Sequence, residues 1–231
     1  APTAKNSIES FAQHAEMTAA LQNLIGILYY SGQEIRTNFA EARKWFTLAA
    51  NQGYGAALRN LGFMHENGND TVVDKVKAAH YYQRAIEKGY NAKSDLERLL
   101  NDVALTGTDL NNMANLYCDG DGISRDYARA VKLYWRAVEK HSGCAMRNLG
   151  SMLENGQYYK KDLREALDYY NRAIRMGYDN GEDVQRVRNK IKSTQSDWVN
   201  IKRNTSRMFE QVSRLPGTIT YAVEQKVKNI R

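Results

Sequence analysis

The sequence predicts an all-α protein, a right-handed α–α superhelix (solenoid) of four helical-hairpin repeats with a helical C-terminal extension. Two observations predict this fold class. A 36-residue pattern of small, acidic and aromatic residues occurs four times, and a heptad pattern of apolar residues replaces it from Val184 onward. Because one helical hairpin cannot bury its apolar face alone, successive copies have to stack on one another.

Composition and charge agree with one folded chain. Of 231 residues, 42% are hydrophobic and 26% are charged, which is ordinary for a globular protein. No run of 18 apolar residues occurs, and the two cysteines exclude a disulfide-dense scaffold. The net charge of +7 is uneven, since residues 184–231 carry 11 Lys and Arg against 3 Asp and Glu. The basic character therefore belongs to the C-terminal fifth of the chain.

The expected organisation has five segments. They are an N-terminal helix in 1–19, repeats one and two in 20–91, an inserted helix in 92–107, repeats three and four in 108–178, and a basic helical C-terminal extension in 179–231. The N-terminal helix is predicted because Ile8, Phe11, Ala12 and Ala15 share one helical face.

Each repeat is predicted to contain two antiparallel helices, A and B. Helix A should end at a glycine, which adopts the left-handed C-cap conformation at least cost, and helix B should begin after an Asn or Asp that caps its free N–H groups. A small residue lets the helices cross closely, and an aromatic pair or near-pair is expected to fill the gap between successive units. In this order, the positions are Gly32, Gly68, Gly120 and Gly156; Asn38, Asp74, Asp126 and Asp162; Gly26, Gly62, Ala114 and Gly150; and Trp45-Phe46, Tyr81-Tyr82, Leu133-Tyr134 and Tyr169-Tyr170.

An insertion of 16 residues separates the second repeat from the third. Within it, Leu96, Leu99, Leu100 and Val103 recur at helical spacing. This spacing predicts one more helix over about 92–105, which spans the join between the two repeat pairs and changes the curvature there.

The 36-residue unit resembles the Sel-one-like repeat (SLR) of the tetratricopeptide-like superfamily. The resemblance is carried by Leu-Gly, then Gly, Asp, Ala, an aromatic pair, Ala and Gly, in four units. Some positions depart from the family pattern, because Glu34, Asp70 and Tyr158 replace a second loop glycine that only Gly122 keeps, and His141 replaces a final glycine. These departures affect the loops rather than the fold. The resemblance implies a protein–protein interaction scaffold or adaptor.

The resemblance also implies a binding face, because helix A lines the concave surface of such superhelices. A carboxamide offers both a donor and an acceptor, so a column of Asn side chains can read a peptide backbone, as helix-A Asn residues do in tetratricopeptide domains. The alternative, that these Asn residues tie neighbouring helices together, stays open. The candidate concave-face residues are Arg59, Asn60, Phe63, Asn112, Asn115, Arg147 and Asn148.

The C-terminal heptads predict a long helix from about 182 to 215, stopped by Pro216-Gly217. One heptad position reads Val184, Ile191, Trp198, Thr205 and Val212, and the other reads Val187, Thr194, Ile201, Met208 and Leu215. Three interpretations stay open: a cap on the last repeat, a coiled coil with a second copy or a partner, and a basic amphipathic helix for membrane or nucleic acid. The candidate contact residues are Trp198, Ile201, Met208 and Val212.

The search for chemistry is mostly negative. The four His residues show no metal-ligand spacing, and no phosphate loop, zinc-protease motif or nucleophile elbow occurs. Cys118 and Cys144 are expected to be free, packed thiols, and the Asp119–Gly122 segment is explained better as a repeat loop than as a calcium loop. We therefore expect no catalytic residue, no metal and no cofactor. Some cysteine-rich relatives have been described as penicillin-binding or weakly hydrolytic, but this chain lacks their paired cysteines.

The expected function is a scaffold that binds a peptide or protein surface on its concave face. The alternative is an immunity or inhibitor protein that occludes a specific toxin or enzyme. The basic extension favours an acidic partner, self-association through the C-terminal helix is a further option, and nucleic acid and membrane are disfavoured. The start at Ala1-Pro2-Thr3-Ala4 and the few cysteines favour export to the periplasm or medium of a bacterium, with the cytoplasm as the other choice.

Overall fold

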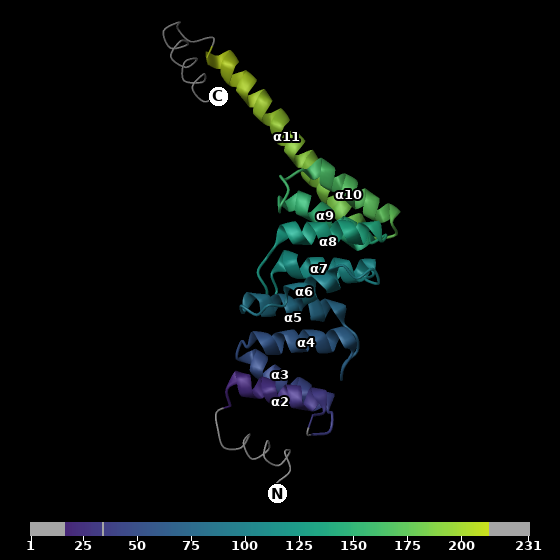
Figure 1. Cartoon of the computed structure of the whole chain (residues 1–231). Coiled ribbons are helices and arrows are strands. Elements are labelled where there is room, and N and C mark those ends of the chain that lie inside the picture. The colour runs from purple at the N-terminus through teal and green to yellow at the C-terminus, as the bar shows by residue number, and fades with distance from the viewer. Residues whose placement is uncertain (1–16, 34, 213–231) are drawn as a thin grey trace.

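The structure is a computed structural model that describes residues 17–33 and 35–212. All regular secondary structure in this part of the chain is helical, which confirms the predicted fold class. The helices stack in one elongated column with α2 at one end, and α11 projects away from the other end (Figure 1). Residues 7–16 of the predicted N-terminal helix lie outside the described residues, as do Leu215 and the Pro216-Gly217 stop.

Four helical hairpins make up the column, and every helix in them has 13 residues. The hairpins are α2 (Ala19–Ser31) with α3 (Phe39–Asn51), α4 (Gly55–Asn67) with α5 (Lys75–Glu87), α7 (Gly107–Asp119) with α8 (Tyr127–Glu139), and α9 (Gly143–Asn155) with α10 (Leu163–Arg175). Between the second and third hairpins lies α6 (Lys93–Leu100), and the last hairpin is followed by α11 (Gly181–Val212).

Both predicted kinds of helix cap are present. The four helix-A glycines have φ between 71° and 73° and lie at the helix C-termini. Each predicted Asn or Asp caps a helix B. In α5, for example, Asp74 Oδ1 accepts a hydrogen bond from Lys77 N at 2.8 Å. Because both signals act within a few residues of the chain, they place the helix ends without knowledge of the tertiary fold.

The small residues permit close helix crossing, as predicted. A Cβ added at Gly62 would lie 2.8 Å from the ring of Tyr82, the second aromatic residue of its pair. This ring therefore packs inside its own hairpin, and the prediction that both aromatics fill the gap between units was wrong for the second one. For the first aromatic the outcome differs between repeats, since the Tyr169 ring lies 6.0 Å from Trp135 of α8, whereas the Tyr81 ring stacks on His65 of its own hairpin at 5.4 Å.

The inserted helix is shorter than expected. Leu96 and Leu99 of α6 are buried, but the helix ends at Leu100 and Val103 is 88% exposed. The prediction that Val103 shares the packed face was therefore wrong. The chain leaves the helix where Asp102 pairs with Lys75 Nζ at 2.6 Å, and Leu105 is the next residue that becomes buried.

Three loop residues replace family glycines in the left-handed conformation. Asp70, His141 and Tyr158 have φ of 57°, 61° and 61°. The backbone thus keeps the shape that glycine would give it, at a cost of roughly 1–2 kcal/mol per non-glycine residue. The departures from the repeat pattern change the local strain and leave the fold intact.

The two cysteines differ from each other. Both are free thiols, as expected. Cys118 is half-buried, and burial raises the pKa of its thiol. Cys144, the second residue of α9, is exposed, so the expectation that it is packed was wrong. It lies at an outward position of helix A, three residues before Arg147.

The final helix has two parts. Its first three turns pack on the last hairpin, where Val184 is 5% exposed, Val187 is fully buried and Ile191 is half-buried. From Thr194 onward every described side chain is exposed, and the helix continues away from the body (Figure 1). The capping interpretation therefore holds for the first part only. Within the described residues, no helix is long and apolar enough to cross a membrane.

Candidate protein-interaction surface

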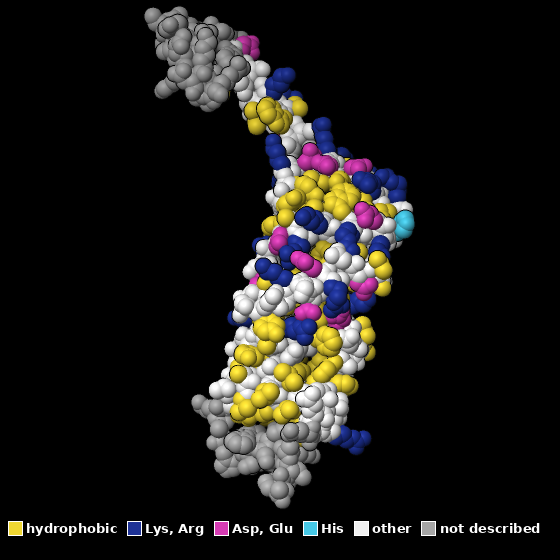
Figure 2. Space-filling view, in the orientation of Figure 1, with side chains coloured by type: hydrophobic (Ala, Val, Ile, Leu, Met, Phe, Trp, Pro, Cys, Tyr) yellow, Lys and Arg dark blue, Asp and Glu magenta, His cyan; other side chains and the backbone are white. Residues whose placement is uncertain are grey.

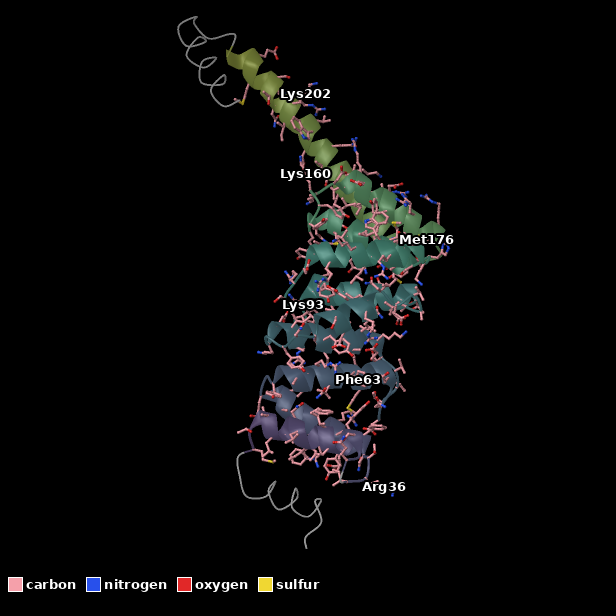
Figure 3. The ribbon with its side chains drawn as sticks, in the orientation of Figure 1. Arg36, Phe63, Lys93, Lys160, Met176 and Lys202 are labelled. Carbon is pink, nitrogen blue, oxygen red and sulfur yellow. The ribbon has the colours of Figure 1, made fainter. Side chains whose placement is uncertain are left out.

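The candidate binding residues lie on the A helices of the second, third and fourth hairpins, and we call the outward surface of the A helices the helix-A face. It is formed by outward positions of α2, α4, α7 and α9, and Figure 3 labels Phe63 on α4. Hydrogen bonds between carboxamides show that successive A helices within each repeat pair are neighbours. Asn60 Nδ2 donates to Asn23 Oδ1 of α2 at 3.0 Å, and Asn148 Nδ2 donates to Asn111 Oδ1 of α7 at 3.0 Å.

We call the side chains of Asn60, Asn112, Asn115 and Asn148 the carboxamide ladder. Three of the four belong to the third and fourth repeats, where most of the hydrogen bonds lie. Asn115 Oδ1 accepts from Asn148 Nδ2 at 3.1 Å and from the Tyr134 hydroxyl at 2.7 Å. Asn111 also donates to Asn112 Oδ1 at 3.2 Å. The two bonds to Asn115 are ties between neighbouring helices, the alternative to partner binding that the sequence left open, whereas the Asn111–Asn112 bond lies within α7.

The two candidate arginines are also tied within the chain. Arg59 makes two hydrogen bonds to Asp95 of α6, at 2.9 and 3.1 Å, and its guanidinium lies 5.5 Å above the Phe63 ring. Arg147 binds Asp183 of α11 in the same two-pronged way, at 2.7 and 3.3 Å. Each arginine therefore joins the A helix of a hairpin to the helix that follows that hairpin.

The ladder does not use all of its hydrogen-bonding groups. Among the described residues, the Oδ1 atoms of Asn60 and Asn148 have no protein partner, and neither do the Nδ2 groups of Asn112 and Asn115. All four side chains are exposed or half-buried. The helix-A face thus offers carboxamide donors and acceptors that are held in place by their other ends.

The polarity of the helix-A face changes along the column. Leu24 and Ile27 of α2 occupy the positions that Asn60 and Phe63 hold in α4, and they are 51% and 41% exposed. In the view of Figure 2, hydrophobic side chains gather over the α2–α4 end of the column and again near α10. Neither residue was among the predicted binding residues, although the 36-residue repeat spacing leads from Asn60 back to Leu24.

A buried carboxylate holds the base of α11. Glu154 of α9 is 3% exposed and accepts hydrogen bonds from the Tyr170 hydroxyl, from Arg186 and from Lys190, each with a contact at 2.7 Å. The Arg186 hydrogen bond, supported by Lys190 and Tyr170, lowers the pKa of Glu154 from 4.5 to about 2. Burial raises the pKa of the Tyr170 hydroxyl, and its hydrogen bond to Glu154 adds to this.

The same arrangement occurs 88 residues earlier. Glu66 accepts hydrogen bonds from the Tyr82 hydroxyl and from Arg98 of α6. Burial opposes ionisation of Glu66, but the Arg98 and Tyr82 hydrogen bonds outweigh it and lower the pKa. This 88-residue period was not recognised from the sequence. It corresponds to two 36-residue repeats together with the 16-residue insertion. Its signals are Arg-Asn-Leu-Gly at 59–62 and 147–150, each followed by Glu-Asn-Gly.

The predicted contact residues of the C-terminal helix lie on its projecting part. Trp198, Ile201 and Met208 are 69%, 58% and 62% exposed. The Val212 side chain lies outside the described residues, although its backbone closes α11. Whether a partner contacts these residues stays a prediction.

The described residues contain no group of three or more His, Cys, Asp and Glu side chains that could hold a metal ion. Asp119 ends α7 and Gly120 forms its C-cap, so the calcium-like sequence is part of a repeat loop. The fold and this surface together define a helical-repeat protein in which stacked hairpins display side chains along an extended face.

Comparison with known proteins identifies the family. The sequence pattern of the Sel1 repeat matches residues 19–54, 55–90, 110–142 and 145–178, together more than half of the chain. The chain belongs to the Sel1 repeat family, which confirms the resemblance. Proteins of this family are generally protein-interaction scaffolds and typically not enzymes.

Two relatives show how far the similarity extends. An uncharacterised protein of Neisseria meningitidis is 38% identical over 147 residues, covering 56% of this chain and 31% of that protein. The ERAD-associated E3 ubiquitin-protein ligase component HRD3B of Arabidopsis thaliana is 36% identical over 70 residues, covering 30% of this chain and 12% of that protein. The matches therefore span about a third or less of these relatives.

Solved structures of Sel1 repeat proteins are also similar. One from Oxalobacter formigenes is 29% identical, with a TM-score of 0.34, over 69% of this chain and 57% of that chain. The protective antigen c5321 of uropathogenic Escherichia coli, described as displaying an SLR fold, is 25% identical, with a TM-score of 0.33, over 69% of this chain and 31% of that chain.

Proposed function

We propose that this protein is an interaction scaffold whose helix-A face binds an extended segment of a partner protein. The carboxamide ladder of Asn60, Asn112, Asn115 and Asn148 is the observation that carries the proposal. Each side chain is fixed by a hydrogen bond at one end and leaves a donor or an acceptor at the surface at the other. An extended peptide presents backbone N–H and C=O groups that match such a ladder.

Preorganisation makes the ladder suited to binding. An Asn that is already held in one rotamer loses less side-chain entropy when a partner binds than a free one does, and about 0.5–1.5 kcal/mol is typical for an immobilised flexible side chain. The apolar end of the face at Leu24, Ile27 and Phe63 would add contact area. The partner would therefore place apolar side chains over α2 and α4 and its more polar part over α7 and α9.

The acidic character of the partner is part of the proposal. The excess of Lys and Arg after residue 184 supports it, because complementary charge speeds association and favours one class of partner over others. Acidic protein surfaces should therefore be captured more readily at low salt than at high salt.

Site-specific photo-crosslinking tests the proposal. A benzophenone amino acid would replace Asn112 on the helix-A face or, as a matched control, Asn51, an exposed Asn at the end of α3. After exposure to a lysate of the source organism, a partner peptide should crosslink from position 112 and not from position 51. The helix-A face is not the binding face if the two positions crosslink equally, or if the same partner crosslinks only from position 51.

A further inference from the structure

A second surface of a different kind lies where α11 leaves the body. A groove of about 700 Å³ separates the start of α10 from the middle of α11. Its lining consists of Lys161, Asp162, Leu163, Arg164, Ile191, Thr194, Gln195, Trp198 and Val199. None of these residues is on the helix-A face, so this groove is separate from the binding face proposed above.

The groove has an apolar floor and an aromatic wall. Leu163 and Ile191 are half-buried and pack against the cluster that contains Tyr170 and Val187. Trp198, about two turns beyond Ile191 along α11, is 69% exposed. An exposed Trp next to a pre-formed apolar floor is a common anchor in protein interfaces, since Trp is enriched among the residues that dominate binding energy.

The internal copy of this unit has a more polar groove at the matched place, about 580 Å³ in volume, which Val73, Asp74, Lys75, Val76, Lys77, Asp109 and Asn112 line. The residue that matches Leu163, 88 positions earlier, is Lys75, and the match of Lys190 is Asp102. Lys75 and Asp102 form an ion pair of 2.6 Å where α6 has already ended. In the second copy Lys190 instead binds Glu154, α11 continues, and a leucine stands at the start of α10. The apolar floor of the α10–α11 groove therefore arises from changes at matched positions of a repeated unit.

The lining of the groove carries two cations and one carboxylate. Lys161 and Arg164 line it, and Figure 3 shows Lys160 near the base of α11 and Lys202 further along that helix. Asp162 is the one carboxylate in the lining, and its Oδ1 accepts hydrogen bonds from the backbone N–H groups of Arg164 and Glu165. The groove thus combines an apolar floor with cations that have no carboxylate partner in the lining.

We propose that this groove docks an acidic segment of a partner protein, with one large apolar side chain inserted between Leu163 and Trp198. The apolar side chain would remove the floor and the Trp198 ring from water. Carboxylates on either side of it would meet Lys161 and Arg164. The opposite charge of groove and segment selects this occupant over a second copy of the basic C-terminal extension.

The probe is a phage-displayed library of random 12-residue peptides, selected on the full chain. The enriched peptides are synthesised and titrated while Trp198 emission is followed as the difference from the Trp198→Phe variant. The enriched peptides are expected to carry several Asp or Glu residues around a Phe, Leu or Trp. Their binding should shift the emission to shorter wavelength and weaken at least tenfold between 50 mM and 500 mM salt.

Three variants in the full chain locate the binding. Leu163→Lys introduces the residue that the internal copy carries and should weaken binding at least tenfold, as should Trp198→Ala. Met208→Ala, on the same exposed stripe but outside the groove, should leave the affinity within twofold. Photo-crosslinking from position 112 should be unchanged in Leu163→Lys, so that failure of this proposal is distinguishable from failure of the helix-A proposal.

Four outcomes would overturn the proposal. The first is enrichment of basic or uncharged peptides, or of no peptide at all, and the second is equal binding by wild type and Leu163→Lys. The third is a concentration-dependent dimer in sedimentation that Leu163→Lys abolishes, which would make a second copy the occupant. The fourth is a Trp198 emission that is already shifted and shielded from acrylamide in the free monomer, which would make residues 213–231 of the same chain the occupant.

Discussion

Replacing Glu154 with Gln should strongly destabilise the junction between α9 and α11. The carboxylate is 3% exposed and bound by Arg186, Lys190 and Tyr170. A pKa of about 2 instead of 4.5 means that these partners favour the ionised form by about 3 kcal/mol. Gln resembles the neutral acid in shape, so Glu154→Gln should lower the free energy of unfolding by about 2–3 kcal/mol.

Urea denaturation followed by circular dichroism measures this loss at pH 7. Glu66→Gln is the matched control in the internal copy, where one cation, Arg98, binds the carboxylate instead of two. It should lose less stability than Glu154→Gln. The reasoning is refuted if Glu154→Gln lowers the unfolding free energy by less than about 0.5 kcal/mol, or by no more than Glu66→Gln does.

Four further predictions concern pH, backbone strain, packing and helix crossing. Because the pKa of Glu154 is lower in the folded than in the unfolded chain, its stabilisation is complete above pH 4.5 and is lost as the pH falls toward 2; the pH profile of the unfolding midpoint should flatten there in Glu154→Gln. His141→Gly should stabilise the protein by roughly 1 kcal/mol, because φ is 61° at this position, and a lower melting temperature would contradict this. Val187→Ala should cost about 2 kcal/mol, since the side chain is fully buried, while Val199→Ala on the exposed part of α11 should change little in the same melts. Gly62→Ala should cost roughly 1–3 kcal/mol, because the new Cβ would lie 2.8 Å from the Tyr82 ring; an unchanged denaturation midpoint would show that the ring moves freely.

The Asn ladder shows a limit of sequence patterns. The spacing placed Asn60, Asn112 and Asn148 at equivalent positions of successive A helices, and the structure has them there. The pattern could not say what each carboxamide bonds to, because that depends on the distance and rotation between neighbouring helices. One consequence is that Asn60→Ala and Asn148→Ala would remove ties between helices as well as any partner contact, whereas the Nδ2 group of Asn112 has no such tie.

The C-terminal helix shows a second limit. Its heptads continue from Val184 to Val212 with only Thr194 and Thr205 not apolar, so the sequence predicted one continuous helix and gave no reason for its two ends to differ. In the structure Val187 is buried and Trp198 is 69% exposed. The difference arises where α10 ends its contact with α11, which depends on the angle between the two helices rather than on either sequence alone.

The sequence by itself determined the helices, their caps, the four repeats and the family, because these depend on residues a few positions apart and on a period that recurs four times. Only the tertiary structure decided that Glu154 and Glu66 each accept hydrogen bonds from a Tyr and an Arg at matched positions. It also decided that the first part of α11 packs on the last hairpin while the rest projects, and that a groove opens beside Leu163. Each of these depends on how one hairpin is rotated against the next. That rotation is set by many weak side-chain contacts acting together, and no single stretch of sequence encodes it.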